Sequence, residues 1–127
     1  MARLSRRVQV ASAAGALVAG IALSACGNGA AISQAKIACD RIDHSIRDLQ
    51  RATAKEGTPE GAILKAKAQS ELLSALAPAA AATSADGSFN ALMTTISEAG
   101  RVPEALLVDA LAAQCKVVKS NTPYLAS

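Results

Sequence analysis

The amino-acid sequence predicts an all-α fold, a small antiparallel four-helix bundle with up-down-up-down topology. Composition points to helices, because alanine is abundant while aromatic residues, which strands favour, make up only 2% of the chain. Four segments carry apolar residues at helical spacing, and short connections containing glycine or proline separate them. Short connections favour antiparallel neighbours, so these segments predict a bundle.

The first predicted helix covers residues 32–55. Its apolar residues recur at alternating spacings of three and four, as in a core stripe; they are Ile32, Ala35, Cys39, Ile42, Ile46 and Leu49. The opposite face is charged, and Asp43 and Arg47 stand four residues apart, where an ion pair supports a helix. Gly57 is a natural stop, because glycine readily adopts the left-handed conformation that ends many helices.

The second predicted helix covers residues 59–77. The segment Thr58-Pro59-Glu60 combines a favoured N-cap, a proline at the first helical position and an acid at the positive end of the helix dipole. The apolar face consists of Leu64, Ala68, Leu72, Leu73 and Leu76. Pro78 ends or kinks this helix, and the alanines at 79–82 permit a helical continuation beyond the kink.

The third predicted helix follows a turn and cap at Asp86-Gly87-Ser88 and closes at Gly100. One helical face carries Phe89, Leu92, Met93 and Ile96. This face predicts a core contact, and an apolar patch for a partner is the alternative.

The fourth predicted helix opens at Pro103-Glu104 and runs to about Lys119. Its stripe is formed by Val108, Leu111, Cys115 and Val118. Lys116 and Lys119 fall in the last turn, where cations suit the negative end of the helix dipole.

The N-terminal segment differs in character from the four helices. Arg3, Arg6 and Arg7 precede an uncharged, mostly apolar run at 10–23, which has the length of a secretory signal and is shorter than the ~20 residues of a membrane span. We therefore expect a signal peptide at 1–25. The paired arginines resemble a twin-arginine export signal, and Gln9 departs from that pattern.

The segment Leu23-Ser24-Ala25-Cys26-Gly27 resembles the lipobox of bacterial lipoproteins, an aliphatic residue and two small residues before a cysteine. The resemblance implies that Cys26 carries a diacylglyceryl group and becomes the mature N-terminus; an ordinary secretory signal is the alternative. Two or more acyl chains anchor a protein stably in a membrane. Together with the alanine bias, the lipobox indicates an envelope lipoprotein of a bacterium of the actinobacterial type.

The odd number of cysteines is explained if Cys26 is the lipid anchor. The remaining two, Cys39 and Cys115, would then form a disulfide in an oxidising compartment. Free thiols and a two-cysteine metal site are the alternatives, and no CxxC or suitably placed histidine favours the metal. An up-down-up-down bundle would place these cysteines side by side on the first and last helices.

The charge of the chain excludes one class of function. The formal net charge of +3 comes entirely from the arginines of the signal segment, so the mature chain carries equal numbers of basic and acidic residues. A nucleic-acid partner would require a basic surface, and we expect none.

Catalysis has little support in the sequence. The chain lacks the serine-hydrolase, phosphate-loop, dinucleotide and zinc-protease motifs. His44, the single histidine, has Asp40 and Asp48 four residues away on either side. A solvated histidine among surface carboxylates is the main interpretation, and a weak metal site or an acid–base pair is the alternative. We expect no metal, no cofactor and no enzymatic activity.

We therefore expect a signal peptide at 1–25, the lipidated Cys26 with a flexible tether to residue 31, a helical bundle at 32–120 and a tail at 121–127. The protein would be anchored on the extracytoplasmic face of the cell membrane. As function we expect an interaction or structural module that contacts another envelope protein. The alternatives are a carrier with a small-ligand pocket between alanine-rich helices and an enzyme that uses His44.

Overall fold

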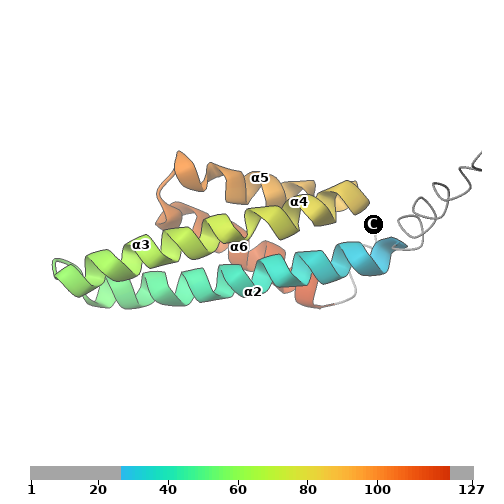
Figure 1. Cartoon of the computed structure of the whole chain (residues 1–127). Helices are drawn as coiled ribbons and strands as arrows, with labels where there is room; N and C mark the ends of the chain where they lie inside the picture. The colour runs from blue at the N-terminus through green and yellow to red at the C-terminus, as the bar shows by residue number, and fades with distance from the viewer. Residues whose placement is uncertain (1–26, 121–127) are drawn as a thin grey trace, which may run out of the picture.

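The computed structural model describes residues 27–120, which fold into helices. These helices are α2 (Gly27–Ala54), α3 (Pro59–Ser74), α4 (Leu76–Ala85), α5 (Asn90–Ser97) and α6 (Glu104–Lys119). The short 3₁₀ turns η1 (Gly87–Phe89) and η2 (Glu98–Gly100) flank α5. Because α3 and α4 form one rod with a break, four helices pack together, as predicted. They run alternately in opposite directions along one long axis (Figure 1).

Helix α2 begins earlier than predicted. Residues 27–31 are helical, so the prediction of a flexible tether there is wrong. Alanine is the strongest helix former, and Ala31 is fully buried against the core. Burial therefore extends the helix ahead of Ile32, the first large apolar residue. The predicted lipidation site Cys26 and the predicted tail at 121–127 lie outside the described residues.

The buried face of α2 consists mainly of small side chains. Three residues of the predicted stripe are fully buried: Ala35, Cys39 and Ile42. The remaining three, Ile32, Ile46 and Leu49, are half-buried at its border. The rest of the buried stripe is formed by Ala31, Ala38, Ser45, Asp48 and Ala52. Small residues allow α3 and α4 to pack closely, and α4 contributes Ala79 and Ala82 to the same core.

The break between α3 and α4 lies at Ala75, just ahead of Pro78. Proline has no N–H with which to bond the Ser74 carbonyl, and its ring crowds that group. The Ser74 carbonyl instead accepts a hydrogen bond from Nη1 of Arg41 on α2. The alanines at 79–82 then continue as α4. The proline therefore marks a break in the rod but does not end it.

The third and fourth helices bury the faces that the spacing indicated, with one change. Phe89, Leu92 and Ile96 lie in the core, which confirms the core contact over a free apolar patch. On α6, Leu107 is buried in place of Val108, which is half-buried. The stripe thus starts one residue earlier and passes through Leu111 to Cys115.

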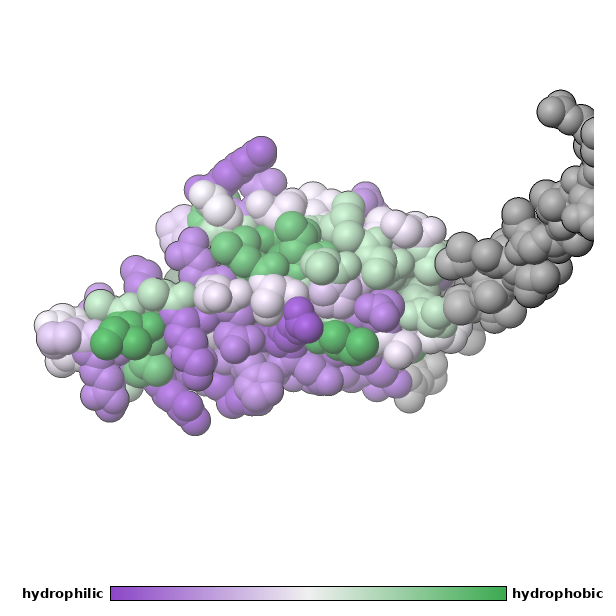
Figure 2. Space-filling view, in the orientation of Figure 1, coloured by the Kyte–Doolittle hydropathy of each residue, from purple (hydrophilic) through white to green (hydrophobic). Residues whose placement is uncertain are grey.

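The surface is uneven in polarity. Hydrophilic residues cover most of the outer face of α2, and hydrophobic residues gather around the junction of α3 and α4 in this view (Figure 2). Ile63 and Leu106 are the most exposed large apolar side chains of the described part, at 69% and 72%. Within residues 27–120, every helix is too short or too polar to cross a bilayer.

Candidate functional site

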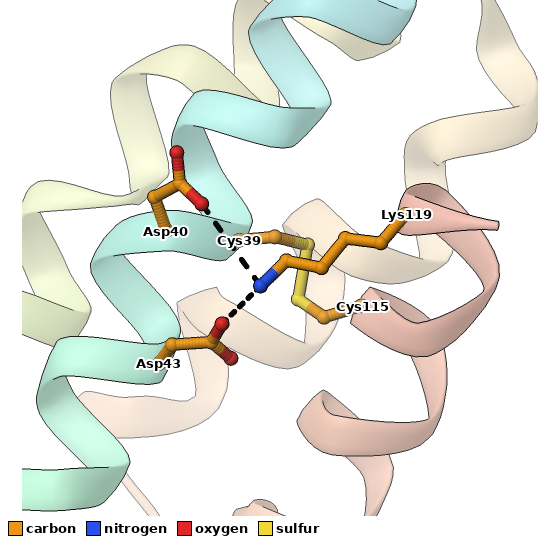
Figure 3. Close-up of a disulfide and its surroundings, with 5 residues drawn as sticks. All are labelled: Cys39, Asp40, Asp43, Cys115 and Lys119. Atoms are coloured by element: carbon orange, nitrogen blue, oxygen red, sulfur yellow. Dashed lines mark hydrogen bonds and ion pairs between the residues drawn. A yellow bond between two sulfur atoms is a disulfide. The ribbon is translucent and has the colours of Figure 1, made fainter. Parts of the chain in front are cut away.

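The two cysteines predicted to pair are joined by a disulfide. The Cα atoms of Cys39 and Cys115 are 5.4 Å apart, within the range of bonded cysteines. Both residues are almost completely buried. The bond connects α2 to α6, the first and last helices, as predicted (Figure 3). Free thiols and a two-cysteine metal site are thereby excluded.

An ion-pair cluster lies beside the disulfide. Lys119, in the last turn of α6, reaches across to α2, where it donates a hydrogen bond to Asp43 and lies 3.9 Å from Asp40 (Figure 3). Asp43 therefore pairs with another helix and not with Arg47, which the spacing within α2 had suggested. The last turn of α6 packs at this level of α2, so a partner from outside the helix takes the carboxylate. Pairs this exposed contribute about 0.2–1 kcal/mol each.

His44 lies on the exposed face of α2. Its Nδ1 is 3.1 Å from Nη2 of Arg47. The two carboxylates considered as its partners are engaged elsewhere, Asp40 with Lys119 and Asp48 with Lys67. Within residues 27–120, no three His, Cys, Asp or Glu side chains converge as metal ligands. The weak metal site and the acid–base pair considered for His44 are thus not assembled.

Helices α2 and α3 form a hairpin. The tight turn that joins them contains residues whose types suit its conformation. Gly57 has φ +80°, the left-handed conformation that glycine adopts most easily. Thr58 caps α3, because its hydroxyl oxygen accepts a hydrogen bond from the Gly61 N–H at 3.0 Å. The same hydroxyl donates to the Lys55 carbonyl at 2.6 Å. A salt bridge between Lys55 and Glu60 closes the tip.

Gly61 is required where the two helices of the hairpin meet. A Cβ at this position would lie 2.2 Å from the carbonyl oxygen of Lys55. Real Cβ atoms do not approach a backbone oxygen so closely, so only glycine lets the start of α3 lie this close to the end of α2. The hairpin projects beyond the connection between α5 and α6 (Figure 1).

A cleft of about 910 Å³ lies between the hairpin and the segment that joins η2 to α6. Its apolar lining includes Leu49, Ala52, Ala62, Ala99, Val102 and Pro103. Three ionisable side chains also line it: Glu56, Lys65 and Glu104. A cleft with apolar walls and a few polar groups is the usual form of a small-molecule site.

Behind the cleft, a buried serine connects three helices. The Ser45 hydroxyl of α2 is 2.5 Å from the carbonyl oxygen of Ala68 on α3. It also contacts a carboxylate oxygen of Glu104 at the start of α6. Ser45 is fully buried, and burial raises the pKa of the Glu104 carboxyl above its ordinary range, an effect that the hydrogen bond from Ser45 opposes. This contact holds the first turn of α6 against the hairpin.

A second buried polar group lies one turn further along α2. The Asp48 side chain is only 7% exposed and is neutralised by two cations. Lys67 Nζ lies 3.2 Å from its carboxylate and Arg51 Nη1 lies 3.6 Å from it. Glu104, in contrast, has no cation within 4.0 Å among the described residues.

Sequence motifs do not identify this site. They point to the single histidine and the cysteines, while Ser45 and Glu104 occupy ordinary positions on their predicted helices. One signal was present: Ser45 lies three residues after Ile42, on the buried stripe, where a hydroxyl requires a partner. No family model, curated protein or solved structure matches this chain. The cleft and its polar groups are therefore the basis on which function is inferred.

Proposed function

We propose that this chain is a non-catalytic, lipid-anchored protein of the bacterial cell envelope that binds a small ligand in the cleft. The cleft carries the proposal, because its volume of about 910 Å³ falls within the ~300–1,000 Å³ of typical small-molecule sites. The sequence led us to expect an interaction or structural module, with a small-ligand carrier and an enzyme that uses His44 as alternatives. A continuous cleft of this size favours the carrier.

The position of the cleft supports this function. A lipid on Cys26 would be attached directly before Gly27, the first residue of α2. Helix α2 has 28 residues, so at ~1.5 Å per residue it would extend ~42 Å from the anchor. The hairpin tip is at the far end of that helix, so the cleft would lie away from the membrane on its extracytoplasmic side. A ligand in the surrounding medium would reach it there.

An interaction module is the second candidate, and one observation favours it. Ile63 and Leu106, both largely exposed, directly follow the cleft residues Ala62 and Ala105 in sequence. Exposed apolar groups near a cleft would suit an envelope protein that covers it. A pull-down with lipidated protein from membranes, compared with the Cys26→Ala form, tests this candidate. Loss of the captured protein in Ile63→Glu would support it.

The lipid anchor is tested by labelling cells with a radioactive or clickable fatty acid. We expect label on the wild-type protein and none on Cys26→Ala. Label that survives the substitution, or no label on the wild type, would rule out lipidation at Cys26. Cell fractionation supplies the matching localisation, with the wild type in the membrane fraction.

Ligand binding is tested by native mass spectrometry of the protein purified from its own membranes. We expect a bound small molecule on the wild type and its loss in Ala105→Trp, because the indole would fill the cleft. Ala112→Trp is the matched control, since Ala112 is an exposed alanine on the same helix outside the cleft. A ligand retained equally by both variants would show that the cleft is not its site.

A further inference from the structure

The Glu104 carboxyl is half-buried in the cleft, where it loses contact with water without gaining a positively charged partner from the described part of the chain. Most of the other carboxylates in contact with neighbouring helices have a cation: Asp43 has Lys119, and Asp48 has Lys67. Glu104 lines the cleft and has no lysine, arginine or histidine within 4.0 Å among residues 27–120. A carboxylate removed from water without a counter-charge is costly, so this group favours its neutral form or a positive partner.

The number of hydrogens available at Ser45 also indicates that Glu104 favours its neutral form or a positive partner. A serine hydroxyl has one hydrogen to donate, yet the Ser45 oxygen lies within hydrogen-bond distance of two acceptors, the Ala68 carbonyl and the Glu104 carboxyl. If Glu104 is protonated, it donates to Ser45, which donates to Ala68, and all three groups are satisfied. If Glu104 is ionised, it competes with Ala68 for the one hydrogen. With Glu104 ionised, the two acceptors share one hydrogen, and a ligand in the cleft can supply the further donor to the carboxylate.

We propose that the cleft selects ligands that carry a cationic nitrogen on an apolar body, with the Glu104 carboxylate as partner of the positive charge. The inference rests on the proposed ligand-binding function and names its ligand class. The cation would donate to the ionised Glu104 carboxylate from the cleft, and would compensate its charge whether the single Ser45 hydrogen goes to Glu104 or to Ala68. The apolar body would lie against the aliphatic walls provided by Leu49, Ala99 and Val102.

The other charged groups around Glu104 favour a cation over an anion. Glu56, at the end of the hairpin, adds a second negative charge to the lining, and an anionic ligand would lie beside both carboxylates. Lys65 lines the cleft from α3 and is exposed like Glu56, so these two charges of opposite sign offset each other and leave Glu104 as the uncompensated charge of the lining. Asp48 and Lys67, on the helices that carry Ser45 and Ala68, neutralise each other.

Three matched probes test the charge preference: benzylammonium, benzyl alcohol and benzoate. Each is titrated into the full chain, purified in a non-ionic detergent, while the methyl NMR signals of Leu49 and Val102 are followed. The aromatic ring of the probe is a useful reporter, because the whole chain has a single Phe, a single Tyr and no Trp. Signals from cleft methyls also distinguish binding in the cleft from partition into detergent.

We expect benzylammonium to bind about tenfold more tightly than benzyl alcohol, as one charge-assisted hydrogen bond would produce, and benzoate to bind most weakly. The preference should increase as pH rises through the titration of Glu104 and should disappear in Glu104→Gln. Glu71→Gln, which removes a carboxylate outside the cleft, should retain it. In the wild type, benzylammonium should also lower the pKa of Glu104, a result that does not depend on any variant folding.

The outcomes separate the two proposals. Equal binding of the ammonium and the alcohol, or a preference that survives Glu104→Gln, would refute the cation assignment and leave binding in the cleft intact. If none of the probes shifts the cleft methyls at millimolar concentration, both the cation assignment and the ligand-binding function are contradicted.

Discussion

Reduction of the Cys39–Cys115 disulfide should remove a large part of the stability of this protein. The bond closes a loop between residues that are 76 apart in sequence. In the unfolded chain such a cross-link restricts the ensemble, and the chain-entropy relation for this separation gives about 4.5 kcal/mol at 25 °C. Domains of this size are stable by only about 5–15 kcal/mol in total. The side chains of the α2 core are mostly small, so little hydrophobic burial is available to compensate.

The assay is urea unfolding of the full chain, followed by circular dichroism at 222 nm. Comparison of oxidised with reduced wild type changes the cross-link while leaving every other residue in place. The Cys39→Ala/Cys115→Ala double variant adds the loss of two buried sulfur atoms, so it should be less stable than the reduced wild type. The slope of the transition should also rise on reduction, because an unfolded chain without the cross-link exposes more surface.

A loss below about 1 kcal/mol on reduction would refute this reasoning, because it would require an unfolded state that stays compact without the bond. An unchanged slope of the urea transition on reduction would also indicate an unfolded state that stays compact without the bond. A loss of the expected size with an increased slope would confirm that the disulfide acts mainly on the unfolded chain.

Three further predictions concern the hairpin and the cleft, and urea midpoints measure all of them. Gly61→Ala should cost about 2 kcal/mol or more, since its Cβ would meet the Lys55 carbonyl oxygen at 2.2 Å, while Gly100→Ala, with open space around it, should change stability by less than ~0.5 kcal/mol. Thr58→Ala should cost ~1 kcal/mol through loss of the cap, and Thr58→Ser should retain most of it. Burial raises the pKa of Glu104, so its stabilising contribution is complete below the ordinary glutamate pKa of about 4.3 and is lost as pH rises through the raised value. Relative to Glu104→Gln, the wild type should become less stable across that window; a constant difference would contradict the assignment.

Most of the fold could be predicted from the sequence because its helices obey local rules. Thr58 and Pro59 mark the start of α3 with a cap and a fixed φ angle, and the structure places that start at Pro59. The pairing of Cys39 with Cys115 followed from bundle topology, which brings the first and last helices together. The first inference needs only residue type and spacing along one helix, and the second needs only the cysteine count and the order of the helices in the bundle.

The start of α2 and the candidate site could not be predicted in the same way. Ala31 belongs to the core because other helices cover it, and alanine carries no strong hydrophobic signal of its own. The cleft depends on how far the hairpin projects past the α5–α6 connection, a property of helix lengths in three dimensions. Ser45 and Glu104 stand 59 residues apart, so no spacing rule within a helix connects them. His44 was expected to be a solvated histidine among surface carboxylates, and the fold leaves it at the surface.

The distribution of stabilising features along the bundle explains how a cleft can persist at one end. The disulfide and the Lys119 ion pairs lie at the middle of α2, and the buried alanines Ala31, Ala35 and Ala38 lie in its first half. The hairpin tip instead relies on local contacts: the Thr58 cap, the Lys55–Glu60 salt bridge and the close approach at Gly61. None of these three contacts involves α6, so the hairpin wall of the cleft is held at its tip by contacts within the hairpin itself. Such a preformed wall lowers the entropy cost of binding. The opposite wall is attached through Ser45 and Glu104, so the group that would recognise a ligand is also the one that holds the cleft together.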